Sequence, residues 1–206
     1  MGIRNLGRPA VFLDRDGVLN ALVLNPATGR MESPLTPDDL RLVDGVIPAL
    51  RRLQQAGYPL VLVSNQPNFA LGKSTLNMLG AVHCRLETTL MGAGIHFARF
   101  CYCLHHPKGV VPGYSDLCVC RKPSPWFLLR ARDDFGYTLA DSWMIGDQPT
   151  DTQCGRAAGV RTIRLNSGAV AAERSGAPAA DYMVWQFSEA AEIILAHRPS
   201  DAARGH

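Results

Sequence analysis

Short apolar runs along this chain alternate with longer segments in which apolar residues recur every three or four positions. The short runs predict buried strands and the longer segments predict amphipathic helices. The predicted strands cover residues 10–13, 59–63, 98–102, 142–145, 160–164 and 182–184. The predicted helices cover residues 46–56, 74–91, 124–135, 149–158 and 188–197. Strands that alternate with helices favour an α/β fold, with a doubly wound, mainly parallel, Rossmann-like sheet covered on both faces.

Two stretches interrupt this alternation. Residues 20–39 form a long loop rich in Pro, Gly, Thr and Asp, and residues 103–122 show little periodicity. Loops of this length in compact domains are usually functional or mobile. The 206 residues fit one domain, which we expect over residues 1–198 with the second stretch as an insertion and no large cap domain. Residues 199–206 are expected to be a disordered tail.

Composition and charge exclude several classes of protein. Apolar residues make up 47% of the chain and charged residues 19%, as in an ordinary globular protein. The net charge of +3 is too mild for a nucleic-acid-binding protein, and no dense Lys/Arg run is present. No apolar run is long enough to span a membrane, and the N-terminus lacks the apolar core of a signal peptide. We therefore expect a cytoplasmic monomer that acts on a small molecule.

Several predicted strands end in side chains that bind phosphate or metal ions. Asp14 and Asp16 follow the first strand, Ser64 follows the second, and Asp147 follows the strand at 142–145. The carboxyl ends of parallel strands form the ligand-binding edge of such a sheet. Two acids one residue apart can also be an ordinary strand followed by an Asp-Gly turn. The repetition at three strand ends favours a site.

These residue types suit phosphoryl transfer. Asp14 could attack phosphorus to form an aspartyl-phosphate. Asp16, two residues on in an extended segment, could protonate the leaving oxygen and later deprotonate a water. Asp147 would complete a carboxylate site for Mg²⁺. Ser64 and Lys122 could supply a hydroxyl donor and a positive charge to the phosphoryl oxygens.

Four short motifs together resemble those of the haloacid dehalogenase superfamily of phosphatases. The resemblance covers roughly residues 10–168 and depends on the order and spacing of these motifs. They are Asp14-Arg15-Asp16-Gly17, Ser64-Asn65-Gln66, Arg121-Lys122-Pro123 and Gly146-Asp147-xxx-Asp151.

This resemblance assigns roles to the site residues. It implies that Asp14 is the nucleophile and a Mg²⁺ ligand, that Asp16 is the acid and base and gives its backbone carbonyl to the metal, and that Asp147 is the third protein ligand. Ser64 and Lys122 would bind phosphate.

Two further residues in the same motifs each have two interpretations. The resemblance makes Asp151 a partner of the metal ligands rather than a ligand, and the alternative is a solvated carboxylate on a helix face. Asn65 could orient the substrate loop through its amide, or it could be a turn residue.

A cluster of cysteine and histidine lies in the aperiodic stretch 103–122, here called the zinc loop. One Cys-x-His step and one Cys-x-Cys step together supply three thiols and one imidazole. This set suits a closed tetrahedral Zn²⁺ site. The predicted ligands are Cys103, His105, Cys118 and Cys120. A closed set leaves no position for water, so the zinc would be structural. The alternatives are unmetallated thiols, and His106 in place of His105.

The sequence of the zinc loop resembles that of one particular family within this superfamily. Cys-x-His-His-Pro followed by Cys-x-Cys-Arg-Lys-Pro resembles the heptose 1,7-bisphosphate 7-phosphatases, which release the C7 phosphate before nucleotide activation. The related histidinol-phosphate phosphatases have a shorter segment between the two ligand pairs. The alternative enzyme is a phosphatase of histidinol phosphate or of another small sugar phosphate. Arg121 would then contact the substrate or its second phosphate, because its planar fork suits phosphate oxygens. The non-enzymatic alternative is a catalytically silent phosphate-binding or zinc-organised module. Asp16 argues against it, because a silent module would not need a residue that acts as acid and base.

One loop departs from that family. Where its members typically read Ser-Gly-Ile-Ala-Arg-Gly, this chain has the sequence Pro-Asn-Phe-Ala-Leu-Gly-Lys over residues 67–73. Leu71 replaces the arginine, and Lys73 could substitute for it. In the long first loop, Arg30 or Glu32 could contact substrate, although a solvated loop is the simpler interpretation.

Overall fold

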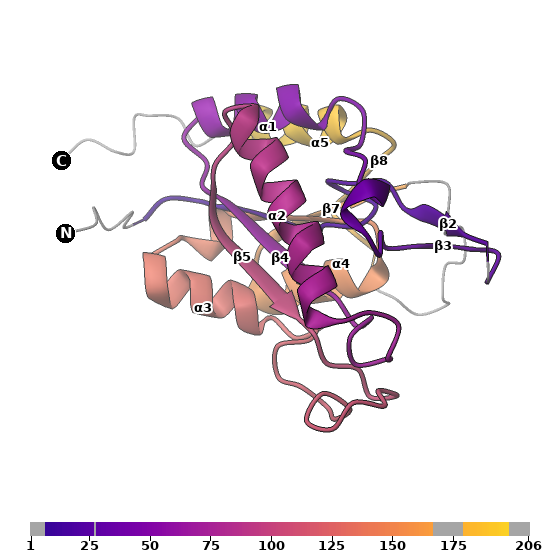
Figure 1. Ribbon diagram of the computed structural model, residues 1–206. Coiled ribbons are helices and arrows are strands. Elements are labelled where there is room, and N and C mark those ends of the chain that lie inside the picture. The colour runs from indigo at the N-terminus through magenta and orange to yellow at the C-terminus, as the bar shows by residue number, and fades with distance from the viewer. Residues whose placement is uncertain (1–6, 27, 167–178, 198–206) are drawn as a thin grey trace.

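The computed structural model describes residues 7–26, 28–166 and 179–197. In this part of the chain the main sheet has six strands in the order β5-β4-β1-β6-β7-β8, all parallel (Figure 1). The strands are β1 (Val11–Leu13), β4 (Leu60–Asn65), β5 (Phe97–Cys103), β6 (Trp143–Gly146), β7 (Arg161–Leu165) and β8 (Tyr182–Val184). The order reverses beside β1, and such a switch point is where ligands bind in open α/β sheets. The predicted tail at 199–206 lies outside the described residues.

Five α-helices in the described ranges cover the sheet. They are α1 (Val46–Gln55), α2 (Leu76–Gly92), α3 (Trp126–Phe135), α4 (Pro149–Ala158) and α5 (Phe187–Ala196). Residues of α1, α2 and α5 share one buried apolar cluster, and residues of α3 and α4 share a second. Two short 3₁₀ helices, Pro37–Asp39 and Leu139–Asp141, complete these elements. The fold is therefore the doubly wound α/β fold that the sequence predicts.

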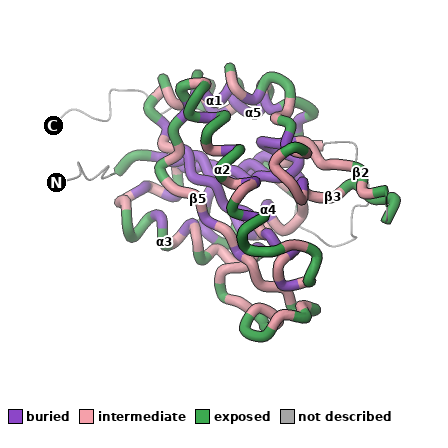
Figure 2. Tube along the Cα trace, in the orientation of Figure 1, coloured by how far each residue is buried: buried purple, intermediate pink, exposed green. Residues whose placement is uncertain are grey.

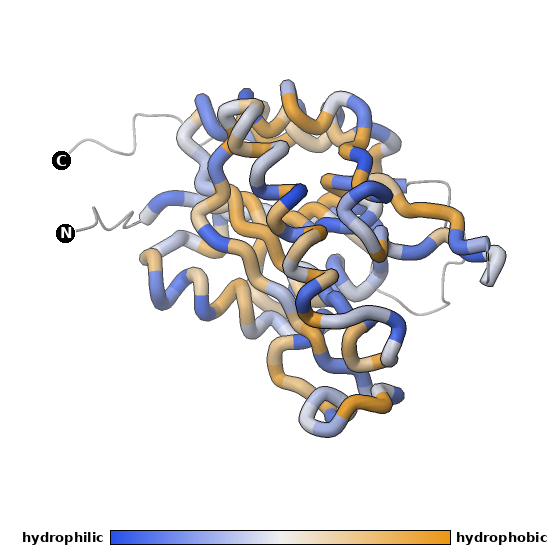
Figure 3. The backbone as a smooth tube through the Cα atoms, in the orientation of Figure 1, coloured by the Kyte–Doolittle hydropathy of each residue, from blue (hydrophilic) through white to orange (hydrophobic). Residues whose placement is uncertain are grey.

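The alternation of side chains along the central strands divides the core in two. Val11 and Leu13 face the α1, α2 and α5 side, whereas Phe12 between them faces α3 and α4. All three are fully buried, and the strands stand out as the buried, apolar centre of the molecule (Figures 2 and 3). Because both faces are covered, these strands are continuous apolar runs rather than alternating patterns.

The segment treated as a long loop contains a hairpin that the sequence analysis missed. Strands β2 (Val23–Asn25) and β3 (Arg30–Glu32) pair antiparallel, and Figure 1 shows them projecting beside the main sheet. The two strands have three residues each and none is fully buried. Strands of three residues are too short to show a periodic pattern, which is why the sequence analysis did not find the pair.

None of the described helices is long and apolar enough to cross a bilayer.

Candidate active site

The predicted site residues meet at the carboxyl edge of the sheet. Asp14 and Asp16 follow β1, Asn65 ends β4, and Asp147 follows β6. All four line a pocket of about 480 Å³, within the volume range of small-molecule sites. The β2–β3 hairpin, the 67–73 loop, the last turn of the zinc loop and the first turn of α4 contribute the rest of its wall. In the described ranges, no large cap domain covers this pocket.

Three buried carboxylates form the floor of the pocket. Oxygen atoms of Asp14, Asp147 and Asp151 lie within 4.8 Å of one another. Burial, together with the charges of Asp151 and Asp16, raises the pKa of Asp14 to about 6 despite the opposing charge of Lys122. Burial and the neighbouring charges of Asp14 and Asp151 raise the pKa of Asp147 to about 7. Acids held this close favour a bound cation that offsets their repulsion.

The donor set suits Mg²⁺. Carboxylate oxygens are the ligands that this hard cation prefers, usually one or two together with phosphate and water. Asp147 Oδ2 accepts a hydrogen bond from the Gln148 amide at 2.9 Å, whereas its buried Oδ1 has no donor among the described residues. Asp147 therefore has one carboxylate oxygen free to bind a cation.

Lys122 joins two of these acids. Its ammonium lies 2.9 Å from Asp14 Oδ1 and 2.6 Å from Asp151 Oδ1, and it donates to the Val63 carbonyl at 2.7 Å. Burial lowers the pKa of Lys122, but the pairing with both acids outweighs it and raises the pKa above its ordinary range. Asp151 Oδ2 accepts from the Gln148 backbone N–H at 2.9 Å. Both Asp151 oxygens are thus engaged by protein groups, which fits a residue that holds Lys122 rather than a metal ligand.

Two glycines permit this close packing. A Cβ at Gly146 would lie 2.1 Å from the Cβ of Asp151, and a Cβ at Gly17 would lie 2.4 Å from Asp147 Oδ2. Gly17 also has φ +78°, which side chains rarely tolerate. The two motifs therefore need glycine at positions 17 and 146, because a side chain there would collide with Asp147 or Asp151.

Gly146→Ala is expected to lower kcat at least tenfold, because the new methyl group displaces Asp151 and misplaces Lys122. The measurement is steady-state phosphate release by the folded variant. Gly80→Ala on α2 is the matched control, since its Cβ meets nothing within 4 Å. Equal kcat for Gly146→Ala and wild type would show that the position of Asp151 is unimportant.

A buried network that the sequence analysis missed holds Asp16. The Arg15 guanidinium, 1% exposed, donates from Nε and Nη2 to the two Asp16 oxygens at 2.9 and 3.0 Å. Gln66 donates to Asp16 Oδ2 at 2.6 Å and accepts from Arg15 at 2.8 Å, and Asn20 donates to Asp16 Oδ1 at 3.0 Å. A charged residue between two acids in a buried run was the available signal, because a buried guanidinium needs partners.

These contacts decide the charge and the position of Asp16. Burial on its own raises the pKa of Asp16, but the Arg15 charge and the hydrogen bonds from Gln66, Asn20 and Ser33 together lower it below its usual value. The carboxylate is therefore fixed in one orientation at the pocket wall, with its charged form favoured.

The other predicted contacts differ in their exposure to the pocket. Ser64 is 1% exposed, accepts a hydrogen bond from Gln66 at 3.0 Å, and is not among the residues lining the pocket. Asn65 lines the pocket, but its amide exchanges two hydrogen bonds of 3.0 Å with the Lys122 backbone. Arg121 lines the pocket and donates to the His105 carbonyl at 3.0 Å. Asn65 and Arg121 thus fix the segment that carries Lys122.

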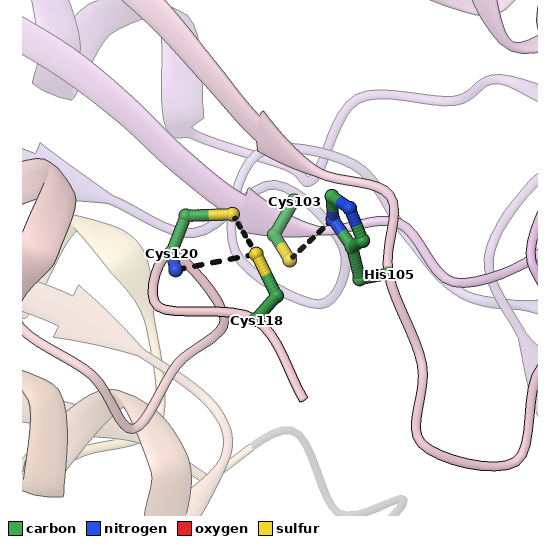
Figure 4. A group of neighbouring side chains, drawn as sticks. All are labelled: Cys103, His105, Cys118 and Cys120. Carbon is green, nitrogen blue, oxygen red and sulfur yellow. Dashed lines mark hydrogen bonds between the residues drawn. The ribbon is translucent and has the colours of Figure 1, made fainter. Parts of the chain in front are cut away.

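The four predicted zinc ligands come together in a second cluster (Figure 4). Cys103 ends β5, and Cys118 and Cys120 return to it from the far side of the zinc loop, with His105 completing the set. One ligand atom of each residue lies within 4.8 Å of the others, which fits a tetrahedral Zn²⁺ site. His106 is outside this cluster and accepts a hydrogen bond from the Lys108 N–H at 3.1 Å.

The zinc loop also contacts the divergent 67–73 loop. The Val110 N–H donates to the Ala70 carbonyl at 2.6 Å. Tyr114 packs edge-on against Phe69 at 4.8 Å and stacks on the zinc-cluster residue His105 at 5.1 Å. The zinc cluster is therefore connected by packing to a wall of the catalytic pocket.

The fold and the strand-end carboxylates define the class of HAD-like hydrolases. A HAD-hydrolase-like family model matches residues 119–190, which include the Lys122, Asp147 and Asp151 motifs. A solved D,D-heptose 1,7-bisphosphate phosphatase from B. bronchiseptica, complexed with magnesium and phosphate, superposes with a TM-score of 0.75 at 26% identity. The superposition covers 92% of this chain and 99% of that one.

Curated relatives narrow the class further. The D-glycero-β-D-manno-heptose-1,7-bisphosphate 7-phosphatase of Yersinia pestis is 34% identical over 188 residues, covering 91% of this chain and 96% of the relative. The protein of that name from Escherichia coli (strain K12) is 38% identical over 154 residues, covering 75% of this chain and 76% of the relative. The chain belongs to the HAD superfamily and, within it, to the family of these heptose-bisphosphate phosphatases.

Proposed function

We propose that this chain is a Mg²⁺-dependent phosphatase that removes the C7 phosphate of a heptose 1,7-bisphosphate through an aspartyl-phosphate. The observation that carries the proposal is the buried cluster in which Lys122 joins Asp14 to Asp151, with Asp147 beside it. Membership of the heptose-bisphosphate phosphatase family supports the substrate, and the pocket volume of about 480 Å³ leaves room for a sugar beyond the reacting phosphate.

The reaction divides into two displacements at phosphorus. In the first, an Asp14 carboxylate oxygen attacks the phosphorus, the bond to the C7 oxygen breaks, and Asp16 gives its proton to that leaving oxygen. In the second, Asp16 takes a proton from water as the water oxygen attacks the same phosphorus. Inorganic phosphate leaves, and Asp14 is regenerated as a carboxylate.

The contacts of Asp16 suit both of its roles. Arg15 and Gln66 favour its charged form, which the second displacement requires of a base. A phosphate dianion brought beside Asp16 raises its pKa, since a like charge disfavours the carboxylate. This favours the protonated form that the first displacement requires.

Charge is balanced by groups on both sides of the reacting phosphate. Asp14, Asp147 and the backbone carbonyl of Asp16 would hold Mg²⁺, which neutralises phosphoryl oxygens and lets an anionic nucleophile approach. Lys122 contributes a second positive charge, and Asp151 keeps it beside Asp14. Arg121 would bind the substrate, Ser64 would support the phosphate-binding strand end, and Asn65 would hold the Lys122 backbone.

A structural zinc would complete the site. A tetrahedral Zn²⁺ site has four ligand positions, and all four would be filled by Cys103, His105, Cys118 and Cys120. No position would remain for water or substrate, so the zinc would be structural. We propose that residues 1–198 work as one phosphatase domain and that the chain acts as a monomer.

A substrate panel tests the function. With Mg²⁺ present, kcat/KM is expected to be highest for one anomer of heptose 1,7-bisphosphate and at least tenfold lower for histidinol phosphate. Removal of Mg²⁺ by a chelator, with readdition as the control, is expected to abolish and restore turnover. Preference for histidinol phosphate would replace the proposed substrate, and no turnover on any phosphate ester would contradict the enzyme.

A further inference from the structure

A second cavity shares a wall with the catalytic pocket. It has a volume of about 220 Å³ and is lined by residues of α2, of β5 and of the start of the zinc loop. Its most buried lining residues are Arg15 and Gln66, which both donate hydrogen bonds to Asp16. Asp16 itself lines the catalytic pocket. The side chains that hold Asp16 therefore separate the two cavities.

Tyr102 is the residue of β5 that lines this second cavity. It lies opposite Ser64 in the parallel register of β5 and β4, at the strand end that precedes Gln66. Its ring packs against the buried cluster on the α2 side of the sheet, whereas Cys101 belongs to the cluster on the other side. Because side chains alternate along a strand, the zinc ligand Cys103 leaves the face opposite to Tyr102. A change of the Tyr102 side chain therefore leaves the zinc face of β5 intact.

A series of polar contacts connects Asp16 with the outer surface of α2 through Tyr102. Arg15 donates to both oxygens of Asp16 at 2.9 and 3.0 Å. Burial raises the pKa of Tyr102 to about 12, although the charge of Arg15 and a hydrogen bond with Arg15 lower it. The Tyr102 hydroxyl lies 3.1 Å from His83 Nδ1, and His83 Nε2 lies 3.7 Å from Glu87 Oε2.

The chemistry of these groups gives each hydrogen bond a direction. A guanidinium can only donate, so the Tyr102 oxygen accepts from Arg15. The Glu87 carboxylate beside His83 Nε2 favours the tautomer that carries its proton on Nε2, which leaves Nδ1 as the acceptor for the Tyr102 hydroxyl. The hydroxyl is thus held on both sides and offers Arg15 an acceptor at a fixed position.

We propose that Tyr102 is a positioning residue for the catalytic acid and acts by fixing the Arg15 guanidinium that holds Asp16. The inference rests on the proposed function, because it requires that Asp16 protonates the leaving oxygen. Arg15 binds both Asp16 oxygens and so sets the orientation of the carboxylate. A displacement of about 1 Å at a reacting group is enough to slow catalysis strongly. His83 contributes in turn by orienting the Tyr102 hydroxyl.

The dependence of the rate on the leaving group tests this role. The leaving oxygen of an alkyl phosphate needs a proton from the acid, whereas p-nitrophenolate leaves readily without one. The quantity compared is kcat/KM, which relates free enzyme and substrate to the transition state. Tyr102→Phe keeps the ring and is expected to lower kcat/KM on heptose 1,7-bisphosphate about tenfold, but on p-nitrophenyl phosphate less than about twofold. Its zinc content and circular dichroism are expected to equal those of wild type.

Tyr182→Phe is the matched control. Tyr182 on β8 is likewise a partly buried strand tyrosine, its hydroxyl lies 2.9 Å from His197 Nε2, and it packs against the same apolar cluster as Tyr102. It lines neither the catalytic pocket nor the second cavity. The control is expected to keep wild-type kcat/KM on both esters, so a selective loss in Tyr102→Phe does not reflect removal of any tyrosine hydroxyl that pairs with a histidine.

A second variant, Tyr102→Ala, allows chemical rescue. A cavity of about 150 Å³ can hold benzene, so the enlarged cavity has room for a free ring. Added phenol is expected to raise kcat/KM of Tyr102→Ala on the bisphosphate about threefold or more, because it returns the hydroxyl to Arg15. Benzene, which lacks the hydroxyl, is expected to give no increase. Equal effects of phenol and benzene would show that Tyr102 only fills space.

Two results with Tyr102→Phe would overturn the positioning role: unchanged kcat/KM on the bisphosphate, or an equal loss on both esters. Asp16→Asn distinguishes this failure from a failure of the proposed function. It is expected to show the same leaving-group dependence as Tyr102→Phe, with a larger loss on the bisphosphate. If Asp16→Asn lowers kcat/KM equally on both esters, Asp16 is not the acid, and the positioning role fails with that assignment.

Discussion

Asp14→Asn is expected to reduce kcat on every phosphate ester by on the order of a thousandfold or more, because an amide cannot attack phosphorus. The substitution keeps the size of the side chain at the centre of the site, where Asp14 lies 2.9 Å from Lys122. The effect is expected in kcat more than in KM, since the lost bond exists only during the reaction. Steady-state assays of the purified variant measure it.

The matched control is Asp133→Asn, which removes an exposed carboxylate of α3 far from the pocket lining. It is expected to retain wild-type turnover. A further readout distinguishes mechanism from folding: acid-quenched wild type is expected to carry one phosphoryl group on the peptide containing Asp14, and the variant none. Comparable turnover of Asp14→Asn and wild type would exclude Asp14 as nucleophile.

Replacement of Cys118 and Cys120 together by serine is expected to remove about one zinc per chain and to lower kcat/KM on the bisphosphate about a hundredfold or more. The zinc loop has little else to hold it, because Val110, Leu117 and Val119 are largely exposed. Without the metal, the loop would no longer fix Lys122 in the pocket or support the 67–73 loop through Ala70.

Metal analysis, limited proteolysis and circular dichroism separate the parts of this expectation. Proteolytic cleavage is expected within residues 103–122, while the circular dichroism signal of the folded sheet is retained. The reason is that neither of the two buried apolar clusters includes a residue of the zinc loop beyond the end of β5. Cys84→Ser, an exposed cysteine of α2, is the control for loss of a thiol. A zinc-free double variant with an uncut loop and full activity would remove the structural role of zinc.

The fold and the floor of the site could be predicted because they depend on local patterns. Buried parallel strands are short apolar runs, and the acids at their ends necessarily meet at one edge of the sheet. Asp14 and Asp147 were predicted in this way, and the four Cys and His residues were predicted from their spacing. The structure brings each set together.

The missed features depend on contacts between distant segments. The network of Arg15 with Gln66 joins residues 51 positions apart, so the sequence signals that Arg15 needs a partner but not which residue supplies it. The β2–β3 hairpin is too short and too exposed to leave a periodic pattern. The Glu32–Lys73 pair joins two loops whose approach depends on the whole fold.

We propose that Asp14 mediates removal of the C7 phosphate and that the C1 phosphate stays in place. Phosphorus NMR of heptose 1,7-bisphosphate with wild-type protein and Mg²⁺ tests this most directly, with Asp14→Asn as the control. The C7 phosphate signal is expected to give way to inorganic phosphate while the C1 signal persists, and the control spectrum is expected to stay unchanged. Loss of the C1 signal first, or equal hydrolysis by Asp14→Asn, would contradict the account.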